Sequence, residues 1–377
     1  MITITETILK MNTIQWIIFL FINCIFVFKY SQRTGINPYI CVLAYILFFL
    51  SVYGIVKKIR KLNYKHATIT LLIFTCLLIS IILMKVDPLS VNVDRWSATT
   101  YFLDGLFSGI YPYGIHTHVS EYNFPSPFPL WHYINIPFWF LGDVGIGLFV
   151  FLFIIAYTVF RFTHSYEKTF FFFLLLFISP AYWWEVIVRS DGLSNQILIF
   201  CTLIFMYKKN ITFETHYILT SIIIGLCACT RLSAIIAIAI YLFNSYIRLS
   251  ISKKICSILL IILTVLAVFA PYILWDTNNW IFFSRNPFMS QSTPANAYIL
   301  IIVSVITIIF TLHNKNNDIF KCISFTSIIM FSFLLSTLVC FHLESKTNVP
   351  VWNDADFDIS YLTLSLPYCL ISLTHKR

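Results

Sequence analysis

Long apolar runs alternate with short polar clusters along most of the chain. The runs are about 17 to 23 residues long, which matches the roughly 20 residues that a helix needs to cross the hydrocarbon core of a bilayer. None of them alternates in polarity over about 10 residues, as the strands of a membrane β-barrel do. The pattern predicts helices over these segments: 12–28, 38–56, 67–84, 144–160, 169–187, 192–206, 217–247, 255–275, 298–313, 319–341 and 360–374.

We therefore predict an all-α fold, a polytopic transmembrane helical bundle of about ten spans that forms one transmembrane domain over residues 1–377. The composition agrees, because 59% of the residues are hydrophobic and 11% are charged, against roughly 25% charged in a soluble domain. A water-soluble fold of this length is excluded. All ten cysteines fall inside apolar runs without a CxxC pair, so we expect small core residues rather than metal ligands.

The basic residues indicate how the helices are oriented. The net charge is +9, but the 25 Lys and Arg residues are scattered among short loops and form no single basic patch, so no nucleic-acid partner is expected. With a cytoplasmic amino terminus, 17 of them lie inside, which is the direction that the positive-inside rule requires. The sequence therefore predicts a multi-pass protein of the cell (inner) membrane.

Segment 217–247 is too long for one crossing, and Thr230-Arg231 interrupts it. Two half-helices joined at Arg231 fit the pattern, as a hairpin that enters and leaves on the same side. A charge at membrane depth faces a cavity or a partner, which makes Arg231 a functional candidate. The alternative is a single tilted helix whose arginine snorkels to the interface.

The principal outer loop, residues 85–143, is longer than a connection between helices requires. Apolar positions after Val93 recur at helical spacing as far as Ile110, which predicts an amphipathic helix on the membrane surface. Asp94 stands at the start of this helix, where it can cap the first turn. Beside Arg95 it can instead stay ionised and accept a proton from a substrate hydroxyl.

Aromatic and acidic residues follow in the same loop. Tyr111, Tyr113 and Glu121 precede three prolines at alternate positions, 125, 127 and 129, which favour an extended path. Aromatic faces beside fixed carboxylates suit sugar rings, although an interfacial aromatic belt is the simpler explanation.

Further charged residues lie at the outer ends of other predicted helices. Arg189, Asp191 and Arg285 are candidates for substrate binding, because arginines at the membrane surface can hold a phosphate or pyrophosphate. The alternating acids Asp354, Asp356 and Asp358 can bind a divalent cation through oxygen ligands, or can simply be solvated. No other cofactor is expected.

The sequence contains no P-loop, dinucleotide, GxSxG or HExxH motif. The cytoplasmic loops leave no room for a nucleotide-binding domain. Any transferred group must therefore arrive on a lipid carrier or already be outside.

Three features carry a family resemblance. They are the outer loop from Asp94 to Pro129, the small-residue run 225–234 with Arg231 near its end, and Arg189-Ser-Asp191 at an outer helix end. Together they resemble the GT-C superfamily of membrane glycosyltransferases, which are mannosyltransferase-like and use polyprenyl-phosphate-linked sugars. The chain departs from that pattern because two helices precede the loop and because Asp94 stands alone where an acidic pair is common.

The resemblance implies a mechanism for an inverting hexosyltransferase. Asp94 would deprotonate the acceptor hydroxyl, which attacks the anomeric carbon as the lipid phosphate leaves. Arg231, Arg189 or Arg285 would offset the charge on the leaving phosphate. Glu121 and Asp191 would orient hydroxyls of the sugar or of a saccharide or lipid acceptor.

Two other functions compete with this one. A transporter or flippase of lipid-linked saccharides would commonly show an internal repeat, which we do not find. A polysaccharide polymerase would place its main outer loop in the second half of the chain rather than in the first third.

Overall fold

A computed structural model describes residues 4–59, 62–275, 286–292, 295–314, 318–345, 349–353 and 357–375. These residues form helices, joined by turns and short 3-10 segments, and no strand occurs in the described ranges. The helices are α1 (Ile4–Ser31), α2 (Pro38–Lys58), α3 (Tyr64–Lys85), α4 (Arg95–Ser108), α5 (Pro129–Phe140), α6 (Gly147–Thr163), α7 (Tyr166–Phe177), α8 (Pro180–Ile187), α9 (Asp191–Lys208), α10 (Phe213–Ala228), α11 (Ala234–Ile247), α12 (Ile251–Trp275), α14 (Pro287–Ser292), α15 (Ala297–His313), α16 (Ile319–Ser345) and α17 (Leu366–His375).

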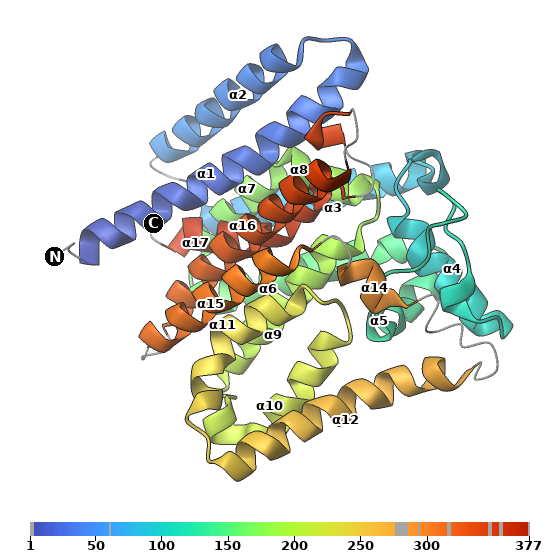
Figure 1. Cartoon of the computed structure of the whole chain (residues 1–377). Coiled ribbons are helices and arrows are strands. Elements are labelled where there is room, and N and C mark those ends of the chain that lie inside the picture. The colour runs from blue at the N-terminus through green and yellow to red at the C-terminus, as the bar shows by residue number, and fades with distance from the viewer. Residues whose placement is uncertain are drawn as a thin grey trace. The chain divides into compact units, whose positions relative to one another are not determined.

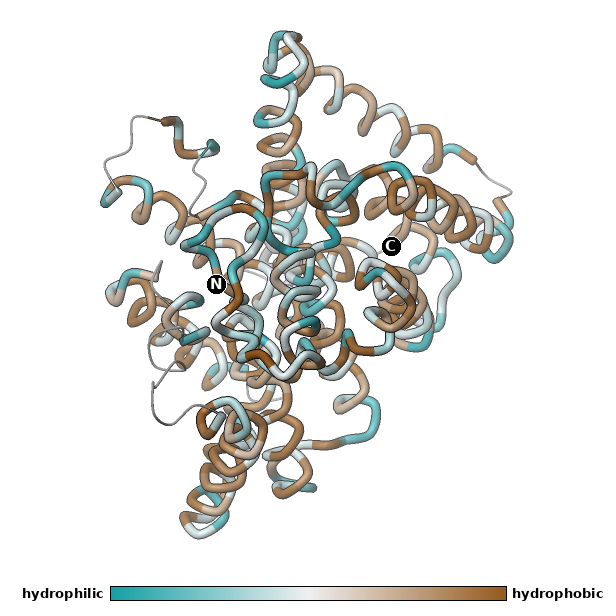
Figure 2. Tube along the Cα trace, turned by 90° about the vertical axis from the view of Figure 1, so that its right-hand side faces the viewer, coloured by the Kyte–Doolittle hydropathy of each residue, from teal (hydrophilic) through white to brown (hydrophobic). Residues whose placement is uncertain are grey.

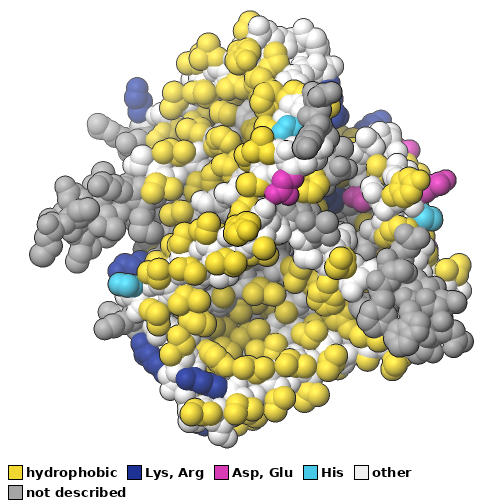
Figure 3. All heavy atoms as spheres, viewed as in Figure 1, with side chains coloured by type: hydrophobic (Ala, Val, Ile, Leu, Met, Phe, Trp, Pro, Cys, Tyr) yellow, Lys and Arg dark blue, Asp and Glu magenta, His cyan; other side chains and the backbone are white. Residues whose placement is uncertain are grey.

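The expected all-helical, multi-pass character is present, but the expected number of spans is not confirmed. Within the described residues, six helical stretches are long and apolar enough to cross a membrane, and a bent pair of helices can make a seventh. Apolar residues run along the long helices and polar ones gather at their ends and in the loops (Figure 2). Hydrophobic side chains also cover most of the face seen in Figure 3, as expected for contact with lipid.

The chain divides into two compact units. The first comprises Met1–Ile81, Ala156–Glu185 and Ile323–Arg377, and the second comprises Ile82–Ile155 and Val186–Cys322. The predicted catalytic and substrate-binding residues all belong to the second unit, which therefore holds the candidate site.

In the first unit, α1 packs against α2 and α17. The segment predicted as one helix over 169–187 is instead the pair α7 and α8, bent by 68°. Pro180 begins α8 and disfavours a continuous helix, because proline has no N–H to donate. Asn23 of α1 supports the break, because its Oδ1 accepts hydrogen bonds from Ser179 Oγ at 2.6 Å and from the Ala181 N–H at 3.3 Å. A polar side chain from a neighbouring helix thus satisfies the backbone that the bend frees.

The last predicted acidic cluster also falls in the first unit. Asp358 forms an ion pair with Lys29 at 2.5 Å and caps the 3-10 segment Ile359–Ser365. Asp354 and Asp356 lie outside the described residues. Among the residues that are described, no three His, Cys, Asp or Glu side chains gather as metal ligands would.

In the second unit, the outer loop contains α4 and α5, which pack against each other. Segment 217–247 forms α10 and α11, which are separated at residues 229–233, the position of Arg231. Helix α12 lies along α10 (Figure 1). Gly225 permits this close approach, because a Cβ there would come within 2.6 Å of the Thr264 Cβ.

Candidate functional site

A buried cluster of charges connects α4, α9 and the break between α10 and α11. The Arg231 guanidinium donates from Nε to Asp191 Oδ2 at 2.6 Å and also contacts that oxygen through Nη2. Arg95 Nη1 lies 3.5 Å from the other oxygen, Asp191 Oδ1. All three residues are buried, so Asp191 is held between two arginines away from solvent. A snorkelling arginine on a single tilted helix does not describe this arrangement.

The start of α9 fixes the position of Asp191 in the cluster. Ser190 is the N-cap of α9, and its Oγ accepts a hydrogen bond from the Gly192 N–H at 3.1 Å. Asp191 therefore occupies the first turn of the helix, where a carboxylate also complements the helix dipole.

The backbone of the α10–α11 break pairs with the proline-rich part of the outer loop. The Phe128 N–H donates to the Thr230 carbonyl at 3.1 Å, and the Leu130 N–H donates to the Cys229 carbonyl at 3.2 Å. These bonds satisfy carbonyl groups that no longer belong to a continuous helix. The outer loop thereby fixes the segment that carries Arg231.

Gln291 in α14 adds a third connection at the same place. Its Oε1 accepts from the Leu232 N–H at 2.9 Å, and its Nε2 donates to the Ser126 carbonyl at 2.5 Å. One side chain thus joins the helix break, at the residue after Arg231, to the proline-rich segment.

Asp94 occupies the N-cap position of α4, but its side chain accepts no capping hydrogen bond. It is half-buried, and a hydrogen bond from its own backbone N–H reaches the carboxylate. Burial raises the pKa of Asp94 above its ordinary value despite the opposing charges of Arg95 and Arg231. The raised pKa favours proton uptake by this carboxylate, and the side chain does not cap α4.

Asp191 has the opposite electrostatic environment. Burial alone would raise the pKa of Asp191, but the positive charges of Arg231 and Arg95 outweigh it and hold the pKa below its ordinary value. The charges of Asp94 and Asp191 also act on each other. Two neighbouring carboxylates with pKa values shifted in opposite directions are suited to different tasks, one to proton uptake and one to a fixed negative charge.

The two tyrosines predicted to bind substrate lie in the core of the outer loop. Tyr111 and Tyr113 are buried, and Tyr113 donates from its hydroxyl to the Pro127 carbonyl at 3.1 Å. His132 Nε2 lies 3.1 Å from the same carbonyl, and its ring stacks on Phe102 at 3.6 Å. Burial lowers the pKa of His132 to about 3, so the ring is neutral and Nε2 carries the proton.

The Arg189 side chain forms hydrogen bonds with groups other than the Asp191–Arg231 pair. It donates from Nε to Asp143 at 2.8 Å and from Nη2 to the carbonyls of Leu83 and Val86 at 3.0 and 3.1 Å. Its backbone adopts φ +49°, a conformation that costs a non-glycine residue energy and that the surrounding structure must enforce. These contacts connect the end of α3 to the start of α6.

Of the predicted site residues, the structure brings together Asp94, Arg95, Asp191 and Arg231. Glu121 is exposed in a turn of the loop, and nothing places it beside this cluster. Arg285 lies outside the described residues. The substrate-binding roles of Arg189, Glu121 and the tyrosines stay predictions.

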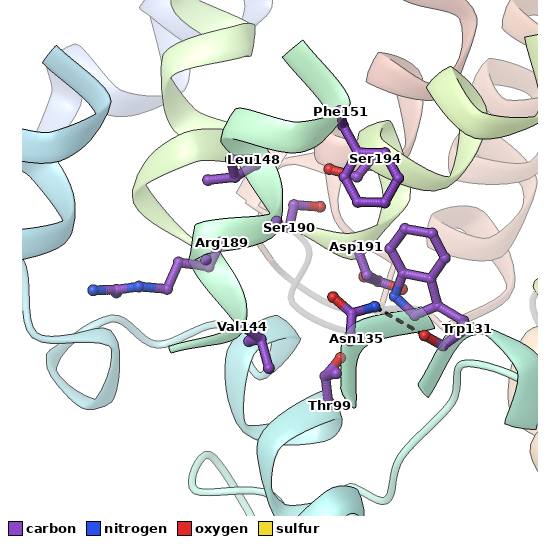
Figure 4. Close-up of a pocket in the computed structure, with 12 residues that line it drawn as sticks. Thr99, Trp131, Asn135, Val144, Leu148, Phe151, Arg189, Ser190, Asp191 and Ser194 are labelled. Atoms are coloured by element: carbon purple, nitrogen blue, oxygen red, sulfur yellow. Dashed lines mark hydrogen bonds between the residues drawn. The ribbon is translucent and has the colours of Figure 1, made fainter. Parts of the chain in front are cut away.

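A small pocket adjoins Asp191 and includes residues that the sequence did not single out. Trp131 and Asn135 of α5, Thr99 of α4 and Ser194 of α9 line it (Figure 4). Asn135 donates to the Trp131 carbonyl at 2.8 Å and so fixes its own orientation. Pro129 is the sequence feature that indicates the start of α5, because proline favours the first position of a helix and α5 begins there.

Comparison of the chain with protein-family models, curated proteins and solved structures finds no match. The fold itself defines the class, a helical membrane protein with several helices able to span a bilayer.

Proposed function

We propose that the protein is an inverting glycosyltransferase that moves a sugar from a polyprenyl-phosphate donor to a saccharide or lipid acceptor on the extracytoplasmic face of the cell membrane. The observation that carries this proposal is the electrostatic interaction of Asp94, whose side chain caps no helix, with a buried Arg95–Asp191–Arg231 cluster. A base and a positively charged site for a leaving phosphate are the two groups that such a transfer needs.

In the proposed reaction, Asp94 accepts the proton of the acceptor hydroxyl. The hydroxyl oxygen forms a bond to the anomeric carbon, and the bond from that carbon to the phosphate oxygen breaks. The electron pair of the broken bond leaves with the lipid phosphate, and the anomeric configuration inverts in this single displacement.

Charge balance supports the assignment of Asp94 rather than Asp191 as the base. With both carboxylates ionised, Asp94, Asp191, Arg95 and Arg231 carry no net charge. Uptake of a proton by Asp94 leaves the cluster with one net positive charge while the leaving phosphate gains negative charge. Asp191 cannot serve in this way, since two arginines stabilise its ionised form.

The proposed topology has a cytoplasmic amino terminus, so that the loop with α4 and α5 faces outward. This follows from the excess of Lys and Arg in the connections assigned to the cytoplasm. Substrates carried on a lipid would reach the cluster from the membrane surface.

The test is to reconstitute the purified protein in liposomes with a panel of radiolabelled polyprenyl-phosphate sugars and lipid or saccharide acceptors. Transfer of single sugars to an acceptor is expected. Movement of labelled lipid across the bilayer without transfer would instead identify a transporter, and repeated addition of saccharide units would identify a polymerase.

A further inference from the structure

The pocket beside Asp191 contains buried polar atoms that lack hydrogen-bond partners. Trp131 is 1% exposed, and its Nε1–H finds no acceptor in the described part of the chain. Asp191 is 4% exposed, and its Oδ1 has the Arg95 ion pair at 3.5 Å but accepts no hydrogen bond there. A buried N–H without an acceptor and a buried carboxylate oxygen without a hydrogen-bond donor can each bond to one polar group that enters the pocket, which would remove the penalty of leaving them unsatisfied.

Figure 4 shows how these groups face the pocket. The indole of Trp131 and the carboxylate of Asp191 lie close together, with the side chains of Thr99 and Asn135 beside them. The guanidinium of Arg189, whose side chain forms another part of the lining, is directed away from them.

The pocket is small, with about 10 Å³ available to the centre of a water-sized group. This is room for roughly one water or one hydroxyl and excludes a whole sugar ring. A phosphate is also disfavoured in this pocket, because the ionised Asp191 forms one wall and would repel it, whereas Arg95 and Arg231 are not part of the lining. A hydroxyl fits both the space and the chemistry, since it donates one hydrogen bond and accepts others.

We infer that this pocket binds one substrate hydroxyl, which donates to Asp191 Oδ1 and accepts from Trp131 Nε1, and that it thereby selects for a hydroxyl at one position. The hydroxyl belongs either to the transferred sugar or to the acceptor, so the inference rests on the proposed function. Trp131 and Thr99 become specificity-determining residues of that reaction.

The experiment compares kcat/KM for an accepted donor and acceptor with kcat/KM for their monodeoxy analogues, in the parent and in Trp131→Phe. The substitution removes the Nε1–H and keeps an aromatic ring. The parent should discriminate against one deoxy analogue. In Trp131→Phe, kcat/KM should fall by about 3- to 10-fold for the complete substrate and by much less for that analogue, because the analogue lacks the hydroxyl that accepts the hydrogen bond.

The position of the sensitive hydroxyl distinguishes the two sources. Sensitivity confined to donor analogues assigns the pocket to the transferred sugar, and sensitivity confined to acceptor analogues assigns it to the acceptor. If Trp131→Phe does not fold, Thr99→Val carries the test, since it removes a pocket hydroxyl at nearly constant volume.

Trp139→Phe is the matched control. Trp139 also lies on α5, but its Nε1 donates to Asp104 at 2.8 Å and it does not line the pocket. It should leave every ratio between complete and deoxy substrates unchanged.

The inference is overturned if Trp131→Phe lowers kcat/KM by one common factor on all analogues, because the pocket would then hold a structural water. That result leaves the proposed function standing. A parent protein that transfers sugar from no donor would overturn both.

Discussion

The ion pair between Asp191 and Arg231 gives the sharpest prediction on stability. Both residues are 4% exposed, and Arg95 lies near the same carboxylate. Replacing Asp191 by asparagine therefore leaves two guanidinium groups in a buried site without their counter-charge. Breaking a buried pair in this way is expected to lower the free energy of unfolding by about 3–5 kcal/mol.

The reciprocal change and a double variant separate loss of the pair from loss of packing. Arg231→Met should lower the free energy of unfolding by a similar amount, because it leaves the buried Asp191 carboxylate without this partner. The double variant Asp191→Leu with Arg231→Met should recover part of this loss, since replacing both members of a buried pair by apolar residues is often close to neutral, while Arg95 still lacks the Asp191 carboxylate.

The assay is denaturant unfolding of the protein in detergent micelles, followed by tryptophan fluorescence. The control is Glu214→Gln, which breaks an exposed pair with Arg248 at 3.6 Å and should cost about 0.2–1 kcal/mol. Single substitutions in the buried pair that cost no more than this control would refute the view that Asp191 and Arg231 form a desolvated pair.

Four other outcomes follow from the same contacts. Because the pKa of Asp94 is raised above 3.8, kcat/KM should fall at acid pH with a midpoint above pH 3.8. Asp94→Asn should remove this dependence on pH. The lowered pKa of Asp191 stabilises the fold above pH 3.8, and this contribution is lost as the pH falls through the pKa of the folded state. The free energy of unfolding should therefore depend less on pH in the acid range in Asp191→Asn than in the parent. Gly225→Ala should destabilise the protein by about 1–3 kcal/mol in thermal unfolding, because its Cβ would collide with Thr264. Gln291→Ala should reduce stability by about 1–3 kcal/mol, because it leaves two backbone groups without their partner.

Local patterns predicted the parts of the fold that depend on neighbouring residues. The polar pair at 230–231 interrupts an apolar run, and the helices α10 and α11 do separate there. The helical spacing after Asp94 likewise corresponds to α4. Hydrophobic periodicity is a local signal, so it locates helices and their ends.

Contacts between distant residues could not be read in the same way. Asp191 and Arg231 are 40 positions apart, and only the tertiary fold brings them together. The bend at Ser179 coincides with Pro180, a local signal, whereas its hydrogen bond to Asn23, 156 positions earlier, depends on the tertiary fold. Apolar runs also do not state how many of them cross the membrane, which is why the expected number of spans is not confirmed.

The role of Trp131 shows a second limit. Aromatic residues are frequent in this chain, and nothing in the sequence separates one with an unsatisfied indole from those in the core. The distinction depends on which atoms find partners after folding.

The central claim, that Asp94 is the base of a sugar transfer, is tested most directly by single-turnover transfer from a polyprenyl-phosphate sugar with Asp94→Asn and Asp104→Asn. Both substitutions change an aspartate of the α4 region, but Asp104 is exposed and bonded to Trp139. We expect Asp94→Asn to slow transfer by roughly 100-fold or more, and Asp104→Asn to change it by less than about 2-fold. Equal rates in the parent and a well-folded Asp94→Asn protein would contradict the account.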